Sequence, residues 1–460
     1  MDPLLGRLVT FYKRGGKTLL VGGRPGTGKT TLALQLSQAL NPKTVTVIST
    51  RMSEELLLKQ YPWIKEYAPR IRIFDFRLSS AEVLVEKFIE GARAEDGLLV
   101  VDSLDTMLHV IADSEARKVE NTLTAIAASQ SDTRTILTSE LIAGFEASST
   151  PLEFAVDGIV ELEMHVRDGR IFRKALLRKL RGSVIDRAEF PFTLSGAKIR
   201  SFDAYREPRL KPLAESIEKK SSSALGRGRS KASMDKAFDF FEKGSICPFE
   251  KGSICLIEFE PIVPLTAVMS FILPVLSRFV NEGGSAYLLP PQQLGPAELS
   301  QIIPELVTTE GLAERLRVWV DVPGFSEPYF WTFTPQSPES DFSNADRVRS
   351  ELRERSAAGG VFVVRSLDRV EGMFPNKLGE VKGELLRSIG AGTAMGDVNV
   401  IISSSTAGLL GSISAMSSRH IKFEAQSGSV VVYGVKPWTR SYLVRSASSV
   451  TLFPHLFVIE

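Results

Sequence analysis

The sequence predicts an α/β protein with two doubly wound domains in tandem, the second a degenerate copy of the first. Three observations lead to this prediction. Apolar strand patterns alternate with helical patterns through residues 1–200 and again through residues 241–460. A phosphate-binding loop follows the first strand in the first half, whereas the second half lacks one. The strand sequence GLLVVDSLDT at residues 97–106 is matched by GVFVVRSLDR at residues 360–369.

Length and composition describe an ordinary globular protein. The 460 residues suit two or three domains, and 43% are hydrophobic and 24% charged. A net charge of +2 gives no overall signal for binding nucleic acid or an anionic membrane. Cys247 and Cys255 are too few for a disulfide framework or a four-ligand zinc site. We expect free thiols in a reducing cytoplasm.

The uncharged, largely apolar stretch at residues 261–277 does not predict a membrane span. It is short for a span and is interrupted by Pro264 and Pro274. The first residues of the chain also lack the continuous apolar core of a signal peptide. We therefore expect a buried helix at 261–277 and no contact with a membrane.

The first functional motif is GRPGTGKTT, which satisfies the phosphate-loop (Walker A) pattern G-x-x-x-x-G-K-[ST]. An apolar strand pattern precedes it and a helical pattern follows it. Glycines allow backbone N–H groups to turn toward phosphate oxygens, and the helix N-terminus adds a positive dipole end. Lys29 is expected to reach the β- and γ-phosphates of ATP, and Thr30 to bind Mg²⁺. The predicted nucleotide-binding residues are Gly23, Arg24, Pro25, Gly26, Thr27, Gly28, Lys29, Thr30 and Thr31.

A nucleotide-hydrolysing enzyme of this kind needs a second carboxylate opposite the loop. Asp102 ends an apolar strand pattern, at the edge of the predicted parallel sheet where ligands of doubly wound folds bind. An unpaired aspartate at the end of a buried strand is costly to desolvate, so we expect a cation partner. Asp102 is therefore the predicted Mg²⁺ carboxylate, together with Thr30.

The rest of the first half continues the alternation. Strand patterns occupy residues 44–49, 70–76 and 133–140. Helical patterns occupy residues 81–92 and the segment around 119–126. Right-handed crossovers between such elements give a parallel sheet with helices on both faces.

Four motifs in roughly residues 1–200 together resemble the KaiC branch of the RecA-like ATPases. They are the phosphate loop, VVDSL at Asp102, TSE ending at Glu140, and KLRGS at residues 179–183. The resemblance implies a RecA/KaiC-like domain, an ATP- and Mg²⁺-dependent P-loop ATPase, and a homo-oligomer. Because the order of elements recurs in the second half, we expect two tandem RecA/KaiC-like doubly wound domains.

The same resemblance implies that Lys179 and Arg181 act across a subunit interface, on the nucleotide of a neighbour. A cation supplied in this way would neutralise charge in the transition state and couple hydrolysis to assembly. No acidic motif of the first half is an evident partner for both cations. The alternative is a basic face on the hairpin at residues 167–187, which has eight basic and two acidic residues.

One departure from the family concerns hydrolysis. The family carries a glutamate pair just after the second strand, and Arg51 and Met52 stand at that place here. Glu54 and Glu55 follow, and they either supply the catalytic carboxylate or only begin a helix. Glu140 is the other candidate for polarising the attacking water. We expect nucleotide binding with slow hydrolysis.

The second half begins after a basic linker, rich in Ser, Pro and Arg, at residues 201–240. An eight-residue tandem repeat at 241–256 leads into the strand that should precede a phosphate loop. The following EPIVPLTA has neither glycine nor lysine. The match with residues 97–106 places Arg365 at the position of the metal carboxylate, where a cation repels Mg²⁺.

These features predict a domain that has lost its nucleotide site, in which Arg365 pairs with a carboxylate or anchors an interface. The alternative is an unrelated α/β domain with one chance strand match. A kinase that phosphorylates itself would need a second nucleotide site, which this half does not offer.

The organisation of the chain, the Ser-Thr-Arg sequence at residues 49–51 and the basic region 167–187 also resemble the archaeal gas-vesicle regulator family GvpD. This resemblance implies a cytoplasmic regulator that binds ATP and contacts a partner protein. The alternative is a RecA/RadB-like DNA-handling ATPase. Residues 135–166 contain no Lys or Arg and several acidic residues, the opposite of what phosphate neutralisation needs. Nucleic acid is therefore the less favoured partner.

Overall fold

The computed structural model describes residues 2–76, 81–106, 133–140, 151–207, 249–306, 312–320, 327–332, 334–448 and 451–459, with a few positions between 107 and 132. The chain divides into two compact units at Asp203/Ala204, called here the N-terminal and C-terminal domains. Most of the expected linker lies outside the described residues. The same holds for the first copy of the tandem repeat with Cys247, and for nearly all of the expected helix at 119–126.

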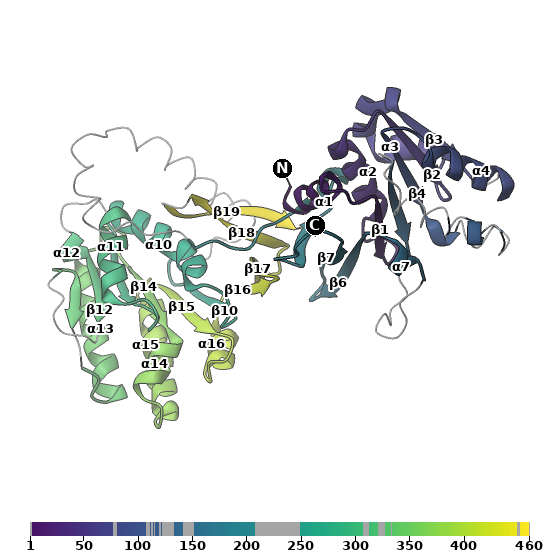
Figure 1. Ribbon diagram of the computed structural model, residues 1–460. Helices are drawn as coiled ribbons and strands as arrows, with labels where there is room; N and C mark the ends of the chain where they lie inside the picture. The colour runs from purple at the N-terminus through teal and green to yellow at the C-terminus, as the bar shows by residue number, and fades with distance from the viewer. Residues whose placement is uncertain are drawn as a thin grey trace, which may run out of the picture. The chain divides into compact units, whose positions relative to one another are not determined.

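The described strands of the N-terminal domain form one sheet of nine, in the order β3-β2-β4-β5-β1-β6-β7-β8-β9 (Figure 1). Strands β1 to β6 pair in parallel and β6 to β9 pair antiparallel. The strands are β1 (Thr18–Gly23), β2 (Thr44–Ser49), β3 (Ile71–Asp75), β4 (Gly97–Asp102), β5 (Arg134–Ser139), β6 (Gly158–Arg167), β7 (Arg170–Leu180), β8 (Glu189–Thr193) and β9 (Arg200–Ser201).

Helices cover both faces of this sheet, as the alternating pattern predicts. Side chains on β4 alternate, so Leu98 and Val100 join the apolar core beneath α2 while Leu99 and Val101 join the core beneath α4. Asp102 continues the alternation on the α2 face. The helices are α1 (Pro3–Lys13), α2 (Lys29–Leu40), α3 (Glu54–Gln60), α4 (Ala81–Ala92) and α7 (Pro151–Ala155), with short 3₁₀ helices η1 (Pro62–Arg70) and η2 (Ser195–Ala197).

The described strands of the C-terminal domain form a sheet of ten, in the order β13-β12-β11-β14-β15-β10-β16-β17-β18-β19. The strands are β10 (Ile254–Phe259), β11 (Ser285–Leu289), β12 (Leu316–Val320), β13 (Phe330–Thr332), β14 (Val361–Ser366), β15 (Val398–Ser404), β16 (Arg419–Gln426), β17 (Ser429–Lys436), β18 (Ser441–Ser448) and β19 (Thr451–Ile459). The helices are α10 (Leu265–Asn281), α11 (Pro296–Leu306), α12 (Leu312–Arg315), α13 (Pro338–Glu354), α14 (Leu367–Met373), α15 (Leu378–Ala394) and α16 (Leu410–Met416).

The two sheets have the same topology once the extra edge strand β13 is set aside. Each strand of the N-terminal sheet has a counterpart at the same position of the C-terminal sheet, from β3 and β12 at one edge to β9 and β19 at the other. Helices α10 and α11 pack on one face of the second sheet and α13 to α15 on the other, as Figure 1 shows. The prediction of two tandem doubly wound domains is confirmed, and a chance strand match does not explain the second half.

The register of the strands corrects the predicted place of Arg365. Val101 is the second-last residue of β4, and Arg365 is the second-last residue of β14, in the same register against the neighbouring strands. Ser366 therefore takes the place of Asp102. A shift of one residue turns a side chain to the opposite face of a sheet, so Arg365 points away from the α10 face. The placement of Arg365 at the metal carboxylate's position is wrong.

The turn after the strand explains why the sequence match misled. Asp105 accepts hydrogen bonds from the Ser139 hydroxyl and the N–H of Glu140 at the end of β5. Asp368 likewise accepts one hydroxyl and one backbone N–H bond at the end of β15, both from Ser404. The two aspartates are therefore equivalent, but the second turn is one residue shorter. An alignment without a gap matches the aspartates and misplaces the strands.

The phosphate loop has a replacement of equal length in the C-terminal domain. Residues 260–264 connect β10 to α10, as residues 24–28 connect β1 to α2. One turn is kept, in which the N–H of Val263 donates to the carbonyl of Glu260 at 2.8 Å. Two of the five residues are prolines without an N–H, and α10 begins with leucine where α2 begins with lysine. The predicted loss of the phosphate loop is confirmed.

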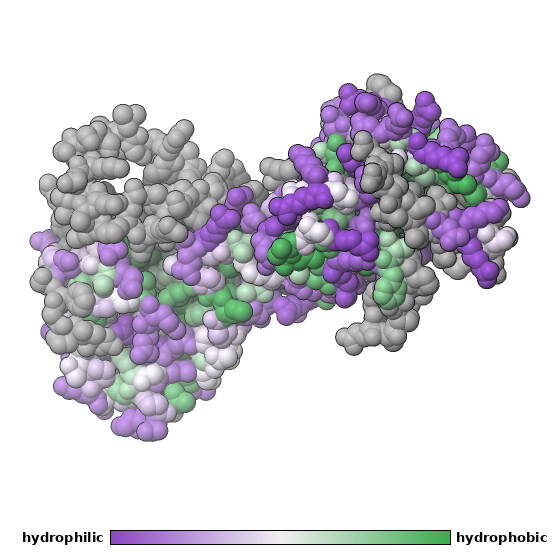
Figure 2. Space-filling model, in the orientation of Figure 1, coloured by the Kyte–Doolittle hydropathy of each residue, from purple (hydrophilic) through white to green (hydrophobic). Residues whose placement is uncertain are grey.

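The uncharged stretch 261–277 lies largely in α10, a buried helix of the core, as expected. Within the described part of the chain, no helix combines the length and apolarity that crossing a membrane requires. On the face drawn in Figure 2, hydrophilic residues cover much of the described surface, with smaller apolar areas between them.

Within the described parts of the chain, Arg365 has no ion pair with a carboxylate, which was one of the two roles expected from the sequence. Its side chain is 3% exposed and donates to Asn399 Oδ1 at 3.0 Å and Ser388 Oγ at 3.3 Å. Burial lowers the pKa of Arg365 to about 9, and the nearby Arg349 acts in the same direction. The guanidinium therefore remains cationic at neutral pH while its near partners are neutral.

The carboxylate best placed to hold this region together is Asp397, which is fully buried. It accepts from Arg353 Nη2 at 2.7 Å and from the N–H of Val361 at 3.0 Å, and lies 3.7 Å from Arg349 Nη1. It thus joins α13 to the start of β14.

We predict that Asp397→Ala lowers the stability of the C-terminal domain by about 3–5 kcal/mol, because it leaves buried arginine charge uncompensated. Denaturant unfolding followed by tryptophan fluorescence measures this, since three of the four tryptophans lie in that domain. Glu351→Ala on the same helix breaks an exposed ion pair with Arg347 and should cost at most about 1 kcal/mol. Equal effects of the two substitutions would contradict the structural role of Asp397.

Candidate nucleotide-binding site

The loop between β1 and α2 needs glycine for its backbone. Gly23, Gly26 and Gly28 have φ values of 154°, 80° and 104°. A Cβ atom on Gly23 would lie 2.5 Å from the carbonyl oxygen of Leu162, and one on Gly28 would lie 2.8 Å from Leu194. Positive φ and close neighbours together restrict these positions to glycine. The structure thus gives the predicted loop its expected shape.

Lys29 begins α2 and its side chain folds back over the loop. It is 6% exposed, and its Nζ donates to the carbonyl oxygens of Gly23 at 2.6 Å and Arg24 at 3.1 Å. Burial lowers the pKa of Lys29, while Glu140 nearby works in the opposite direction. Both hydrogen-bond acceptors are neutral, so an anionic phosphate would be a stronger partner for this ammonium.

Thr30 and Asp102 meet, as predicted for two Mg²⁺ ligands. Thr30 Oγ1 donates to Asp102 Oδ2 at 2.8 Å, and Thr138 Oγ1 donates to Asp102 Oδ1 at 2.6 Å. Asp102 is 3% exposed. A hydroxyl and a buried carboxylate held by neutral donors fit a hard cation such as Mg²⁺. Thr138 was missed from the sequence, although it belongs to the TSE motif that ends β5.

Arg51 and Glu140 form an ion pair beside the loop. Arg51 stands at the position expected for a family glutamate, and its side chain contacts Glu140, one of the candidate catalytic carboxylates. The hydrogen bond from Arg51 lowers the pKa of Glu140. Asp105, also missed from the sequence, fixes the backbone of Glu140 through its N–H. Glu140 is therefore ionised but engaged, which makes it a weaker base toward water.

Glu54 and Glu55 occupy the first turn of α3. Ser53 caps this helix by accepting the N–H of Leu56 at 3.2 Å, and both glutamates are exposed. Acidic residues in a first turn interact favourably with the helix dipole. This location agrees with the helix-start interpretation, and it provides no contact that marks either residue as catalytic.

Lys179 and Arg181 lie together at the end of β7, but each has partners within the N-terminal domain. Arg181 Nη1 lies 2.9 Å from Asp157 Oδ1, and Lys179 Nζ donates to the carbonyls of Glu153 at 2.8 Å and Phe154 at 3.3 Å. No acidic motif was expected to pair with both cations, and the structure gives an ion pair to Arg181, whereas the hydrogen bonds of Lys179 go to backbone carbonyls. The side chain of Arg181 is still 58% exposed, so it is accessible from outside.

The basic hairpin that contains these cations is partly neutralised. Arg178 contacts Glu161 at 2.5 Å, and Lys174 contacts Glu189 at 2.9 Å and Glu163 at 3.3 Å. The charge excess visible in the sequence is therefore reduced by acidic side chains on neighbouring strands.

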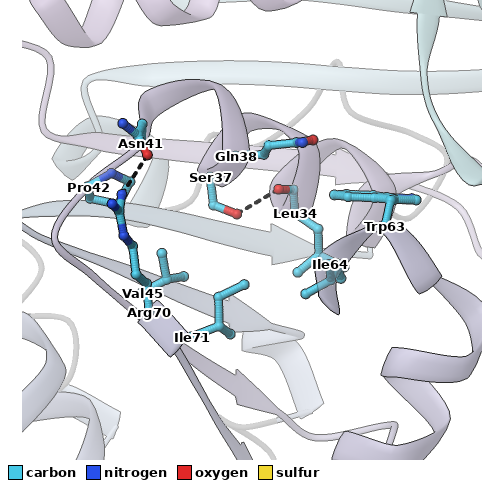
Figure 3. Close-up of a pocket in the computed structure, with 10 residues that line it drawn as sticks. All are labelled: Leu34, Ser37, Gln38, Asn41, Pro42, Val45, Trp63, Ile64, Arg70 and Ile71. Atoms are coloured by element: carbon cyan, nitrogen blue, oxygen red, sulfur yellow. Dashed lines mark hydrogen bonds between the residues drawn. The ribbon is translucent and has the colours of Figure 1, made fainter. Parts of the chain in front are cut away.

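A separate hollow of about 320 Å³ lies at the other end of α2 (Figure 3). Figure 3 shows Leu34, Asn41, Trp63 and Ile64 around it, with Arg70 Nη1 donating to Asn41 Oδ1 at 2.7 Å. Asn41 follows the last residue of α2, whereas Lys29 is the first. This hollow therefore does not belong to the phosphate loop, and no sequence motif had indicated it.

Comparison with known proteins agrees with this geometry. Residues 8–181 match the model of the P-loop domain of the GvpD gas vesicle protein. Protein GvpD2 of Halobacterium salinarum is 24% identical over 474 residues, covering 93% of this chain and 90% of that protein. Protein GvpD1 of the same organism is 24% identical over 359 residues, covering 72% of this chain and 64% of that protein. A solved structure of a KaiC-like protein from Pyrococcus horikoshii is 23% identical over 41% of this chain and 90% of its own, with a TM-score of 0.34.

The family match spans β1, the phosphate loop, Asp102 and the hairpin that ends at Arg181. The resemblance to GvpD, inferred from sequence motifs, is confirmed. Residues 8–181 therefore resemble the P-loop domain of the GvpD gas vesicle protein.

Proposed function

We propose that this protein is a GvpD-like regulator that binds ATP with Mg²⁺ in its N-terminal domain and hydrolyses it slowly. The bound nucleotide would control self-assembly and contact with a partner protein in the cytoplasm. The observation that carries the proposal is the contact between Thr30 and Asp102 beside the buried Lys29. Three groups with the required chemistry converge there at the start of one helix.

The division of roles follows from the geometry. Loop N–H groups and Lys29 would bind the phosphates, and Thr30 and Asp102 would hold Mg²⁺. The metal, when bound, neutralises phosphate charge. Thr138 would orient Asp102, because its hydroxyl occupies the second carboxylate oxygen. Glu140 is the proposed water-orienting carboxylate, restrained by Arg51.

Regulation rather than metabolism is supported by the second domain. It repeats the fold but has proline and leucine where the nucleotide site would require N–H groups and lysine. A domain kept without the site of its fold suits interaction or sensing. The gas-vesicle relatives share most of the length of the chain, including this domain. A protein partner is therefore preferred over the DNA of a RecA/RadB-like ATPase.

The proposed site can be tested by nucleotide binding. Lys29→Ala should lower the affinity for a fluorescent ATP analogue by about ten- to a hundredfold, because a charge-assisted contact is lost. Wild type should bind one nucleotide per chain. Lys43→Ala, an exposed lysine beyond the far end of α2, should leave the affinity unchanged. Two sites per chain, or full affinity in Lys29→Ala, would contradict the assignment.

Hydrolysis should be slow, at or below about 0.1 per second, a hundredfold under the median enzyme. Glu140→Gln should reduce the remaining turnover, whereas Glu54→Gln and Glu55→Gln should not, because those two side chains are exposed on α3. Phosphate release measures all three. Fast turnover that disappears in Glu54→Gln or Glu55→Gln would place the catalytic carboxylate on α3 instead.

ATP should promote homo-oligomerisation if Lys179 and Arg181 reach a neighbour's phosphate. Arg181→Ala should then lower turnover by about a hundredfold with little change in nucleotide affinity. Light scattering with and without a non-hydrolysable analogue measures assembly. A protein that stays monomeric in both conditions, with normal turnover in Arg181→Ala, would leave these cations only their contacts with Asp157 and α7.

A further inference from the structure

A hollow of about 310 Å³ lies in the C-terminal domain on the face covered by α13. Its walls include Leu289 and Arg365 near the carboxyl ends of β11 and β14. Ligands of doubly wound sheets bind outside the carboxyl ends of the strands. Apolar and aromatic side chains make up most of the lining, as in many small-molecule sites. The aromatic members are Tyr287, Trp319, Phe342 and Phe374.

Arg365 brings a buried positive charge to this hollow. Its guanidinium donates hydrogen bonds to the neutral oxygens of Asn399 and Ser388. Among the described residues, no carboxylate forms an ion pair with it. A buried charge without an opposite partner is costly, and the guanidinium has five N–H groups, so donors remain for a further acceptor.

The carboxylates closest to this arginine are engaged elsewhere. Asp346 pairs with Arg349 and Arg387, and Asp397 pairs with Arg353. Burial is the main cause of the lowered pKa of Arg365, and the charge of Arg349 is the next largest cause. The cluster therefore has more arginine than carboxylate, and Arg365 is the arginine of this cluster that lines the hollow.

Tyr287 supplies a second unused donor. Its side chain is 1% exposed, and its hydroxyl has no hydrogen-bond partner among the described residues. Burial raises the pKa of Tyr287, and Arg365 is the neighbouring charge that acts on it most strongly. The hydroxyl is therefore neutral, close to the guanidinium and able to donate. Two donors of this kind match the two oxygens of one carboxylate.

We propose that this hollow binds a small monocarboxylate with a flat apolar body, its carboxylate held by Arg365 and Tyr287. Trp319, Phe342 and Phe374 would contact the body. Asp341 also lines the hollow and is buried, so it opposes the binding of anions, and more strongly the more negative charge they carry. We therefore expect a single carboxylate, paired with Arg365, to be accepted in preference to a multiply charged nucleotide phosphate.

The test uses the full-length protein and three ¹⁹F NMR probes of similar shape: 4-fluorobenzoate, 4-fluorobenzyl alcohol and 4-fluorobenzylamine. The benzoate should bind at one site per chain, at least about tenfold more tightly than the neutral and cationic probes, because a charge-assisted pair is worth that much. Lys29→Ala should leave this binding unchanged.

Tyr287→Phe should lower the affinity for 4-fluorobenzoate by about fivefold, which corresponds to the loss of one hydrogen bond. The stability of the protein should not change, because the hydroxyl has no partner to lose among the described residues. Tyr329→Phe is the matched control. Its hydroxyl is likewise buried without a partner in the described structure, but it packs in the core on the opposite face of the sheet. That variant should bind benzoate normally.

Arg365→Gln should abolish the preference for the acid over the alcohol, with circular dichroism to establish that the variant is folded. If it does not fold, the comparison of Tyr287→Phe with Tyr329→Phe decides. Equal binding of all three probes, no binding of benzoate, or equal affinity of the two tyrosine variants would each overturn the proposal.

Discussion

The hydrogen bond between Thr30 and Asp102 is the contact on which the candidate site depends. It joins the start of α2 to the end of β4, two elements 72 residues apart. In the sheet, β5 lies between β4 and β1, and its Thr138 holds the other oxygen of the same carboxylate. Three adjacent strands must therefore keep their register for the site to exist. The apolar alternation along β4 enforces this, because a slip of one residue would turn Asp102 into the opposite core.

The C-terminal domain shows what the same framework becomes when that contact is not required. Ser366 takes the place of Asp102, and the helix after the loop begins with an apolar residue. Charge has accumulated instead on the other face, where Arg365 of β14 and Arg349 of α13 are buried and both contact Ser388 of α15. Each domain thus has buried polar groups next to its sheet, but on opposite faces of equivalent sheets.

The phosphate loop, Asp102 and the order of strands could be predicted because each depends on local sequence: a glycine pattern, an apolar run and short connections. The position of Arg365 could not, because a turn one residue shorter shifts a strand without changing the residue types that match. The pairs Arg51–Glu140 and Arg181–Asp157 join residues 89 and 24 positions apart, and only the folded sheet brings them together. Tyr287 resembles any core aromatic residue in the sequence, and only the structure shows that its hydroxyl has no partner among the described residues.

The five-residue connections from β1 to α2 and from β10 to α10 differ in the backbone entropy that they lose on folding. Residues 24–28 include two glycines with positive φ, which lose more backbone entropy on folding than any other residue. Residues 260–264 include two prolines, which restrict the unfolded chain and so lose less. The first connection is therefore ordered at an entropic cost that an anion can offset by binding to it. The second connection is restricted by its prolines without a ligand. Heating should therefore loosen the two connections to different extents, and bound nucleotide should reduce the loosening in the N-terminal domain alone.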